Sequence, residues 1–495
     1  MKINVKKNWK DLVDSGAKHA PGLTRREMLA RGMATGAVSV MLPEMIASGF
    51  IKQAFGAINC PAPVRNPGAI AQIFAEGGPT MGARFISEAQ AAAMTVGMAS
   101  NYGISGQANL RRLGPNLVID STSPFGATIL AGPNGYPGGA AAWQANVLSK
   151  VSGGGHLGPF NQDDGAGVNT GLVAGISPFK VSQMGKDIKI RANATPAAFA
   201  RGLPSSSVAG ALTTASLAGV FSLTPAANGL INADAMTAAS DASNALAAAF
   251  SGIFKTNERK GGAQMLNNAG CGFYGNSAMA DPNYGATLFN PANIAALSSK
   301  VTLAQLSAAE QALLAAYYQS AMGVAGGIIS QYGGRDYHGN NPQTDIAPKD
   351  IEEARAIVMF LAACEAANAK GAMIYTSNGQ AIADGALAVT ANIGGVATAL
   401  NAPVAAGDAG GSYNAGLILF YNPAGAGPQA RFTGTVNATS GNAVMDPAVG
   451  SSAEAMAGLY LTALSFINNG SIPANALNAF KAAGVARNTA ASVLL

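Results

Sequence analysis

The chain has 495 residues, of which 49% are hydrophobic and 11% are charged, and it contains three cysteines. This composition excludes an intrinsically disordered protein, which needs low hydrophobicity and high charge, and a disulfide-dense scaffold. Of the 30 basic and 25 acidic residues, nine and four lie in residues 1–57, which leaves 21 of each in the remainder. The net charge of +5 therefore belongs to the N-terminal segment, and a basic surface for nucleic acid is not expected.

Residues 1–57 have the layout of an export leader. Arg25 and Arg26 stand side by side after a lysine-containing stretch, and a weakly apolar run from Met33 to Leu42 follows them. A charged segment before a short apolar segment is typical of an export signal, and the arginine pair is typical of the twin-arginine type. We therefore expect a periplasmic or secreted protein that contacts the twin-arginine export machinery. An amphipathic N-terminal helix that happens to contain the pair is the alternative.

The mature chain, residues 58–495, is expected to form a single large domain without a membrane span. Its best candidate for a span, residues 208–221, is shorter than the roughly 20 apolar residues that a crossing needs. Segments around 121–175 and 256–300 are rich in glycine, proline, asparagine and serine, and they predict loop-rich insertions. The alanine-rich segment 194–255 predicts helices.

The three cysteines leave alternatives open. Cys60 follows Asn59, which matches poorly the small residue that precedes a lipidated cysteine. Cys271 and Cys364 can pair in an oxidising compartment, and two buried thiols are the alternative. Because these cysteines form no C-x-x-C motif, a zinc or iron site built on cysteine is not expected.

Short apolar runs predict the strands of a sheet. Ala69–Ala75 is one such run, followed by the break Glu76-Gly77-Gly78-Pro79, and Asn116–Asp120 is another. The segment after residue 301 predicts alternating elements, which are helix Thr302–Met322, strand Gly326–Tyr332, polar loop Gly333–Pro348, helix Asp350–Asn368, strand Ala372–Thr376 and, further on, strand Leu417–Tyr421. Such alternation indicates a parallel sheet with crossover helices, in which ligands bind beyond the carboxyl ends of the strands.

The loop after strand Gly326–Tyr332 carries the best candidate for chemistry. Asp336 and His338 lie two residues apart in this loop. A carboxylate and an imidazole at the carboxyl end of a parallel strand can both ligate a divalent metal. The alternative is a polar loop in which the aspartate caps a turn and the histidine faces solvent.

A family resemblance rests on these motifs. The loop reads Gly333-Gly334-Arg335-Asp336-Tyr337-His338-Gly339-Asn340-Asn341, the first strand ends near Gly77-Gly78-Pro79, and the leader contains the arginine pair. This order resembles a bacterial family of twin-arginine-exported proteins of unknown function, related to the alkaline-phosphatase/sulfatase-like superfamily. The resemblance implies an α/β fold with a mostly parallel central sheet flanked by helices. It also implies a site in which Asp and His ligands hold one or two metals beside a Ser or Thr nucleophile.

The chain departs from that pattern at several ligand positions. The segment Thr80–Phe85 contains no carboxylate, Asn378 and Gln380 stand where the family has Glu and Arg, and a late motif keeps Asp408 without its histidine. The chain has three histidines in total. The resemblance therefore implies at most one divalent metal (zinc, manganese or calcium). Its candidate ligands are Asp336, His338, Asp408 and His156. Thr80 and a residue of Ser121-Thr122-Ser123 are open alternatives for a nucleophile, so the catalytic residues stay unassigned.

Three functions follow from the sequence. The first is an exported, divergent phosphatase-like protein that has lost metal catalysis and acts by binding or assembly with an envelope protein partner. The second is a metal-dependent hydrolase of phosphate or sulfate esters. The third is a structural envelope protein rich in small residues. A dinucleotide site is not expected, because the G-x-G-x-x-G match at Gly153–Gly158 lacks a strand before it and a helix after it.

Overall fold

A computed structural model describes 68–75, 77–158, 188–191, 199–200, 295, 297–321, 327–377, 379–408, 415–437, 439–472, 477, 481 and 487–495. All of these residues belong to one of the two compact units of the chain, Asn59–Ala233 with Cys271–Leu495. The leader with Arg25 and Arg26, the cysteines Cys60 and Cys271, and most of the segments 194–255 and 256–300 lie outside the described residues. The predictions made for them stay predictions.

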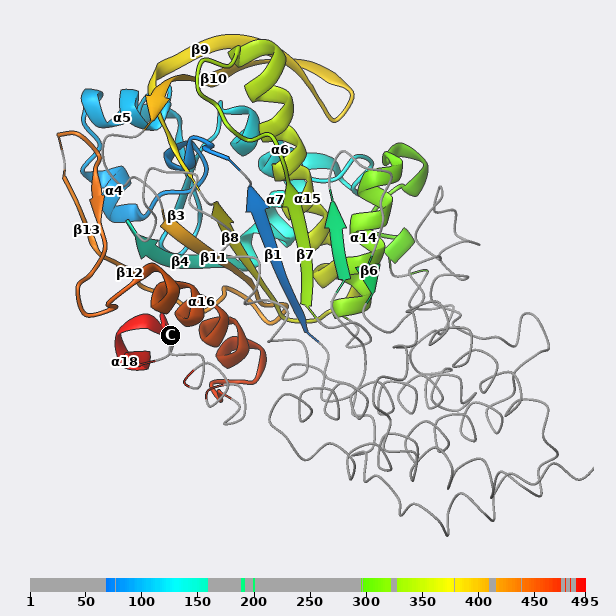
Figure 1. The fold of residues 1–495 in the computed structure, drawn as a ribbon. Coiled ribbons are helices and arrows are strands. Elements are labelled where there is room, and N and C mark those ends of the chain that lie inside the picture. Colours follow the sequence, from blue (N-terminus) through cyan, green and yellow to red (C-terminus); the bar gives the residue numbers. More distant parts are fainter. Residues whose placement is uncertain are drawn as a thin grey trace, which may run out of the picture. The chain divides into compact units, whose positions relative to one another are not determined.

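An eight-stranded sheet forms the centre of the described unit (Figure 1). Its order is β12 (Phe432–Thr433), β4 (Val151–Leu157), β11 (Ala415–Tyr421), β8 (Gly371–Ser377), β1 (Ala69–Ala75), β7 (Gly327–Tyr332), β5 (Ile188–Arg191), β6 (Phe199–Ala200). The strands β8, β1, β7 and β5 are parallel neighbours, whereas β11 runs antiparallel to both β8 and β4. The sheet is therefore mixed with a mostly parallel centre, and the protein is α/β as the sequence predicts.

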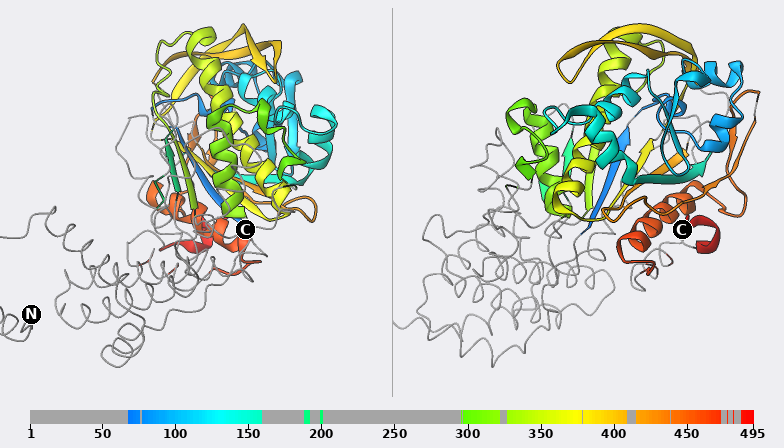
Figure 2. Two further views of the ribbon diagram at one scale, coloured as in Figure 1. Left: turned by 90° about the vertical axis from the view of Figure 1, so that its right-hand side faces the viewer. Right: turned by 180° about the vertical axis from the view of Figure 1, so that it is seen from behind.

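Helices cover both faces of this sheet (Figures 1 and 2). One face carries α14 (Ala308–Ala321), α15 (Ala347–Ala367), α6 (Pro124–Ala131) and α7 (Gly139–Asn146); the other carries α16 (Ser452–Ile467) and α18 (Thr489–Ser492). Alternate residues of each strand point to opposite faces, so Ile73 of β1 joins the larger core and Ile70 the smaller one under α16. Strands buried on both faces read as continuous apolar runs, which is why the sequence reveals them.

Polar side chains inside this core are paired with each other. Gln72 of β1 donates a hydrogen bond to Thr376 Oγ1 at 2.9 Å, and Tyr460 of α16 donates to Gln72 Oε1 at 2.8 Å.

Cys364 lies fully buried in α15 as a thiol. None of the helices that the structure describes is long and apolar enough to cross a membrane.

The boundaries of two helices differ from the sequence prediction. The helix expected from Thr302 begins at Ala308, because Ser307 and Glu310 form reciprocal hydrogen bonds at its start and Leu303–Gln305 forms a separate 3₁₀ turn, η7. The helix expected from Asp350 begins at Ala347, so Pro348 lies in its first turn, where proline is tolerated.

The prediction of loops over 121–175 is wrong for the described part of that range. This part forms α6, α7, the turn η3 (Leu148–Lys150) and β4. Ser123 caps α6 by accepting a hydrogen bond from the Gly126 amide at 2.9 Å. The glycines of β4 belong to a strand because neighbouring backbones approach it closely: a Cβ on Gly154 would lie 2.6 Å from the Arg431 carbonyl oxygen. These glycines therefore serve packing, and they form no phosphate-binding loop.

Smaller elements surround the sheet. They are α4 (Glu88–Ala92), α5 (Val96–Tyr102), the antiparallel pair β2 (Leu110–Gly114) and β3 (Leu117–Asp120), the pair β13 (Thr435–Val436) and β14 (Ala443–Val444), and the short helical turns η1 (Met81–Ala83), η2 (Gln107–Asn109) and η8 (Pro342–Ile346). The strand predicted over Asn116–Asp120 is thus confirmed as β3, although it lies outside the central sheet.

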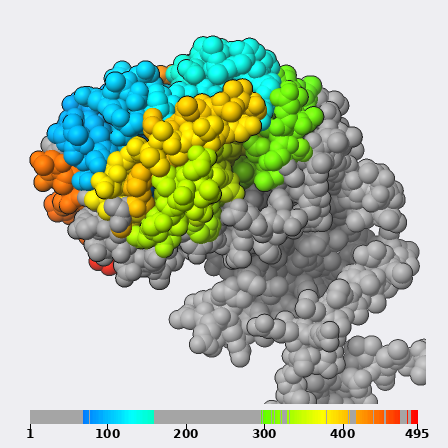
Figure 3. Space-filling view, turned by 90° about the horizontal axis from the view of Figure 1, so that it is seen from above, coloured from blue at the N-terminus to red at the C-terminus, as the bar shows by residue number. Residues whose placement is uncertain are grey.

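The sequence did not predict a long two-stranded ribbon. It consists of β9 (Ala381–Ile393) and β10 (Val396–Asp408), which pair antiparallel directly after β8. Its buried face, with Val389 and Leu400, packs on α6 and on the start of α15. Figure 3 shows the ribbon as a yellow band between the blue surface around α5 and the yellow-green surface of the segment that leads into α15.

Candidate functional site

The loops that follow β1, β7 and β8 are joined at the carboxyl ends of these strands. The Tyr337 amide donates to the Gly78 carbonyl, and the Ala381 amide donates to the Pro79 carbonyl, both at 3.2 Å. A Cβ on Gly77 would lie 2.4 Å from the backbone nitrogen of Asp336, and Gly77 has φ +122°. Glycine is required there because the loop after β1 passes so close to the loop after β7. The motif residues at the end of β1 therefore meet the Asp336–His338 loop.

Asp336 and His338 contact each other within this loop. Asp336 Oδ1 accepts a hydrogen bond from the His338 amide at 3.1 Å and also contacts His338 Nδ1. Burial raises the pKa of Asp336, but the hydrogen bonds and charge of His338 outweigh it and leave that pKa below its usual value. The carboxylate is 53% exposed and the imidazole 28%, so the pair lies at the surface rather than in a closed pocket.

The other two candidate ligands are placed differently. His156 is buried in β4, where its Nε2 donates to the Ser492 carbonyl at 2.9 Å and its Nδ1 lies 2.7 Å from Thr433 Oγ1. Burial lowers its pKa to about 4, so the ring is neutral and tied to the C-terminal segment. Asp408 is the last residue of β10 and pairs with Ala381, and its side chain lies outside the description. Among the residues that the structure describes, no three His, Cys, Asp or Glu side chains converge as a metal site needs.

The candidate nucleophiles also differ from one another. Thr80 is 1% exposed, and its Oγ1 has no hydrogen-bond partner among the described residues. Ser121 Oγ donates to the Asn109 carbonyl, and Ser123 Oγ donates to the Asp120 carbonyl while it caps α6. Both serine hydroxyls are therefore engaged in holding the backbone, and Thr80 is the one beside the joined loops.

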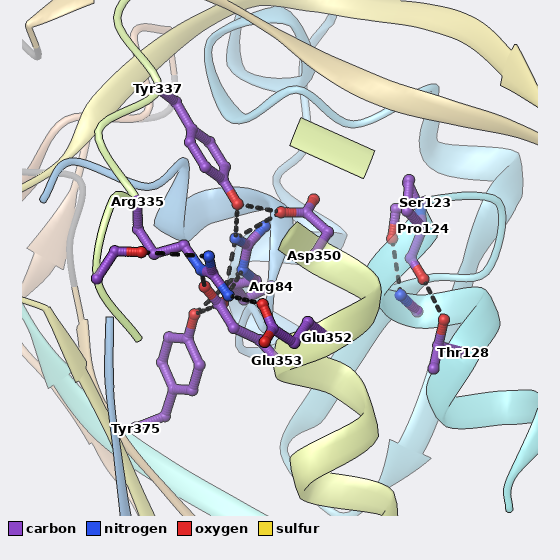
Figure 4. A network of polar contacts seen from close by, with 12 residues as sticks. Arg84, Ser123, Pro124, Thr128, Arg335, Tyr337, Asp350, Glu352, Glu353 and Tyr375 are labelled. Atoms are coloured by element: carbon purple, nitrogen blue, oxygen red, sulfur yellow. Dashed lines mark hydrogen bonds and ion pairs between the residues drawn. The ribbon is translucent and has the colours of Figure 1, made fainter. Parts of the chain in front are cut away.

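Close to these loops lies a buried network that the sequence analysis did not identify (Figure 4). We call it the arginine cluster; its members are Arg84, Arg335, Tyr337, Asp350, Glu352, Glu353 and Tyr375. Arg84 and Arg335 come from the segments after β1 and β7, the three acids from the first turns of α15, and Tyr375 from β8. The cluster thus ties the carboxyl ends of three parallel strands to one helix.

Each arginine of the cluster is paired inside the protein. Arg84 Nη2 lies 2.7 Å from Asp350 Oδ1 and 3.2 Å from Glu353 Oε2. Arg335 donates from Nε to Glu353 Oε1 at 2.7 Å and from Nη2 to Glu352 at 2.5 Å. Glu353 therefore lies between the two guanidinium groups, and all these side chains except Glu352 are almost fully buried.

The two tyrosines of the cluster donate hydrogen bonds to its acids. Tyr337 donates to Asp350 Oδ1 at 2.6 Å, and Tyr375 donates to Glu353 Oε2. Burial raises the pKa of Asp350 to about 6, against the opposing effect of Arg84. Burial disfavours the charge of Arg84, but Asp350 and the other neighbours raise its pKa well above the ordinary value. The arginines therefore remain charged, and the acids of the cluster neutralise their charge.

A pattern in the sequence could have indicated the cluster. Asp350 and Glu353 are three residues apart, so they share a face of α15 with the apolar residues Ala354 and Ile357. Acids on the apolar face of a helix need buried cationic partners. The helix dipole also favours acids in the first turn of a helix, but this effect explains an exposed acid and not a buried one.

Comparisons with family models, with curated proteins and with solved structures found no match to this chain.

Proposed function

We propose that the protein is an exported, divergent relative of the alkaline-phosphatase/sulfatase-like superfamily that acts by binding in the cell envelope. The mostly parallel sheet, the helices on both of its faces and the joined loops at its carboxyl ends support such a fold. The arginine pair and apolar run of the leader support twin-arginine export.

The observation that carries this proposal is the pairing inside the arginine cluster. A hydrolase of phosphate or sulfate esters needs cations or metals that face the anionic ester. Here Arg84 and Arg335 are 1% exposed or less, and their charges are directed at Asp350, Glu352 and Glu353. These groups stabilise the site architecture, and their charges are not directed at a substrate.

The exposed remainder of the site is small. Asp336 and His338 provide two ligands side by side, whereas a catalytic zinc site has three protein ligands and one open position. A surface loop with one carboxylate, one imidazole and several amide groups is suited to contacting a partner. The proposed activity is therefore recognition through the joined loops.

Metal content tests this function directly. We would purify the exported protein, the double variant Asp336→Ala/His338→Ala and the control Asp384→Ala, which removes an exposed carboxylate from β9. We expect equally folded proteins without stoichiometric zinc, manganese or calcium, and no hydrolysis of 4-nitrophenyl phosphate or sulfate. A stoichiometric metal that only the double variant loses would contradict the proposal.

Metal-dependent ester hydrolysis is the second candidate, and the buried Thr80 hydroxyl favours it. Thr80 Oγ1 lacks a partner among the described residues. Thr80 stands two residues after Gly78, where an added Cβ would lie 3.4 Å from His338 Cε1. A nucleophile beside a single metal would be placed in this way. If hydrolysis is found, Thr80→Val should abolish it and Thr80→Ser should retain part of it. Full activity of Thr80→Val would exclude this threonine as the nucleophile.

A further inference from the structure

A surface hollow of about 500 Å³ lies away from the joined loops, between α5, the following loop and the base of the ribbon. None of its lining residues belongs to the candidate site above. They are Met94, Thr95, Val96, Ala99, Ser100, Ile104, Ser105, Gly106, Gln107, Asn109, Gly385, Ala386 and Asn401. Its volume is within the range of roughly 300–1,000 Å³ that is usual for small-molecule sites.

One side of the hollow is polar and held in place from beneath. Ser105 Oγ donates to Asp120 Oδ2 at 2.8 Å and accepts from Asn109 Nδ2 at 2.8 Å. Thr122 Oγ1 donates to Asp120 Oδ1 at 2.8 Å and accepts from Asn401 Nδ2 at 3.1 Å. Asp120 is 2% exposed and also accepts the amides of Ser105 and Thr122, so four donors satisfy its charge. The carboxylate thus fixes the hydroxyls and amides without itself facing the hollow.

Hydrogen-bonding capacity is left over on this side. Each carboxamide of Asn109 and Asn401 donates one hydrogen bond. Within the part of the chain that the structure describes, the second amide hydrogen and the side-chain oxygen of each have no partner. Each asparagine can therefore donate to a ligand and accept from it at the same time.

The remaining lining combines carbon surface with the polar side chains of Thr95, Ser100 and Gln107, and no lining residue is ionisable. Met94, Ala99 and Ile104 supply the carbon surface. A charged ligand would lose its hydration there without gaining an ion pair. A wholly apolar ligand would leave the asparagine amides unsatisfied, which is also unfavourable.

We propose that this hollow binds a neutral, hydroxyl-rich ligand, namely a mono- or disaccharide unit. The hydroxyls of a sugar donate and accept in the way that the two asparagines require, and the carbon–hydrogen face of the ring can pack on the carbon surface of Met94, Ala99 and Ile104. Because Asp120 holds the polar groups in position before the ligand arrives, little conformational entropy is lost on binding.

Binding is tested with the full-length protein and three neutral disaccharides, cellobiose, maltose and N,N′-diacetylchitobiose, by saturation-transfer NMR and titration calorimetry. Glucuronic acid is the charged comparison. We expect at least one neutral disaccharide to bind and glucuronic acid to bind more weakly. Failure of all three disaccharides, or stronger binding of glucuronic acid, would overturn the proposal. So would binding of an extended peptide of alanine and serine in preference to every sugar.

Variants locate the site. Asn401→Ala should weaken binding by about tenfold, as loss of one good hydrogen bond does. Ala386→Trp should fill the hollow and abolish binding. Thr390→Ala, on the same ribbon and exposed outside the hollow, should bind like the parent protein. Melting temperatures check the fold, and if Asn401→Ala unfolds, Ala386→Trp decides alone. Unchanged affinity in a folded Ala386→Trp protein would refute the assignment, whatever the outcome of the metal measurements.

Discussion

Buried carboxylates lie both in the arginine cluster and beneath the hollow, but the groups that surround them differ. In the cluster, Glu353 is held between two guanidinium groups, and charge neutralises charge in the interior. Beneath the hollow, Asp120 is held by hydroxyl and backbone donors that carry no charge. The first arrangement pairs buried charges with each other, although Arg84 Nη1 has no hydrogen-bond partner among the described residues, whereas the second leaves amide groups at the surface.

This difference separates a structural network from a binding surface. The buried ion cluster fixes the relative position of β1, β7, β8 and α15, and its burial keeps its charged groups away from a ligand in solution. A neutral network around one buried carboxylate has the same rigidity and still presents unused donors and acceptors. The strong buried charges of this protein are therefore poor guides to where it binds.

The largest expected effect is on the cluster. Glu353→Ala leaves Arg84 and Arg335 without their shared partner, and loss of one member of a buried ion pair costs about 3–5 kcal/mol. Glu352→Ala is the matched control, because Glu352 is 36% exposed and, among the residues that the structure describes, forms an ion pair only with Arg335; it should cost about 1 kcal/mol or less. Urea unfolding of both variants measures the difference. Equal losses would show that the cluster is not the buried unit described above.

A second effect concerns pH. The pKa of Asp350 is raised in the folded protein from 3.8 to about 6, so the folded state holds this proton where the unfolded state has released it. The contribution of Asp350 to stability is thus fully present below pH 3.8 and is lost as pH rises through about 6. Its size is at most about 1.4 kcal/mol per pKa unit.

Subtraction isolates this contribution. His156 acts in the opposite sense, because its pKa is lowered to about 4 and its contribution is lost as pH falls. We expect the free energy of unfolding of the parent protein, minus that of Asp350→Asn, to decrease between pH 4 and pH 6. Urea titrations at several pH values measure this difference, in which the His156 effect cancels. A flat difference would show that Asp350 keeps an ordinary pKa.

The smallest expected effect is beneath the hollow. Asp120→Ala removes the acceptor for two backbone amides and two hydroxyls and should cost about 1–3 kcal/mol. Asp446→Ala, which removes an acceptor of the Ala448 amide near the surface, should cost less than about 1 kcal/mol. Thermal unfolding compares the two. If Asp120→Ala costs more than Glu353→Ala, the ranking of the two networks is wrong.

Much of the sheet could be predicted from the sequence because its strands are buried on both faces. Ala69–Ala75 and Gly371–Ser377 are mostly apolar and buried along their whole length, and the helices between the parallel strands have acids and polar residues at their starts. The ribbon escaped prediction because alanine dominates both strands and blurs the alternation of buried and exposed positions. Gly394-Gly395, both with positive φ, was the available signal of a hairpin turn.

The candidate site could be predicted only in part. Asp336 and His338 were found because both residue types have recognisable chemistry. They are only two residues apart, so they must also lie close together in space. Arg84 and Glu353 are 269 positions apart, so no local pattern joins them. The hollow could not be predicted either, because it is formed by α5 and by Asn401 of the ribbon, which are far apart in the sequence. Neutral amide side chains also form no recognisable sequence motif.

The order β8–β1–β7 has a consequence for how the protein is made. Ile70 pairs with Gly327 on one side and with Ala372 on the other, so the central strand is synthesised long before either neighbour. At about 5–20 residues per second, an apolar strand would wait for roughly 13–50 seconds without its partners on the ribosome. Such a strand is prone to aggregate while it waits. We therefore expect strand Ala69–Ala75 to need protection by chaperones during synthesis, and shortening that wait should raise the yield of folded protein.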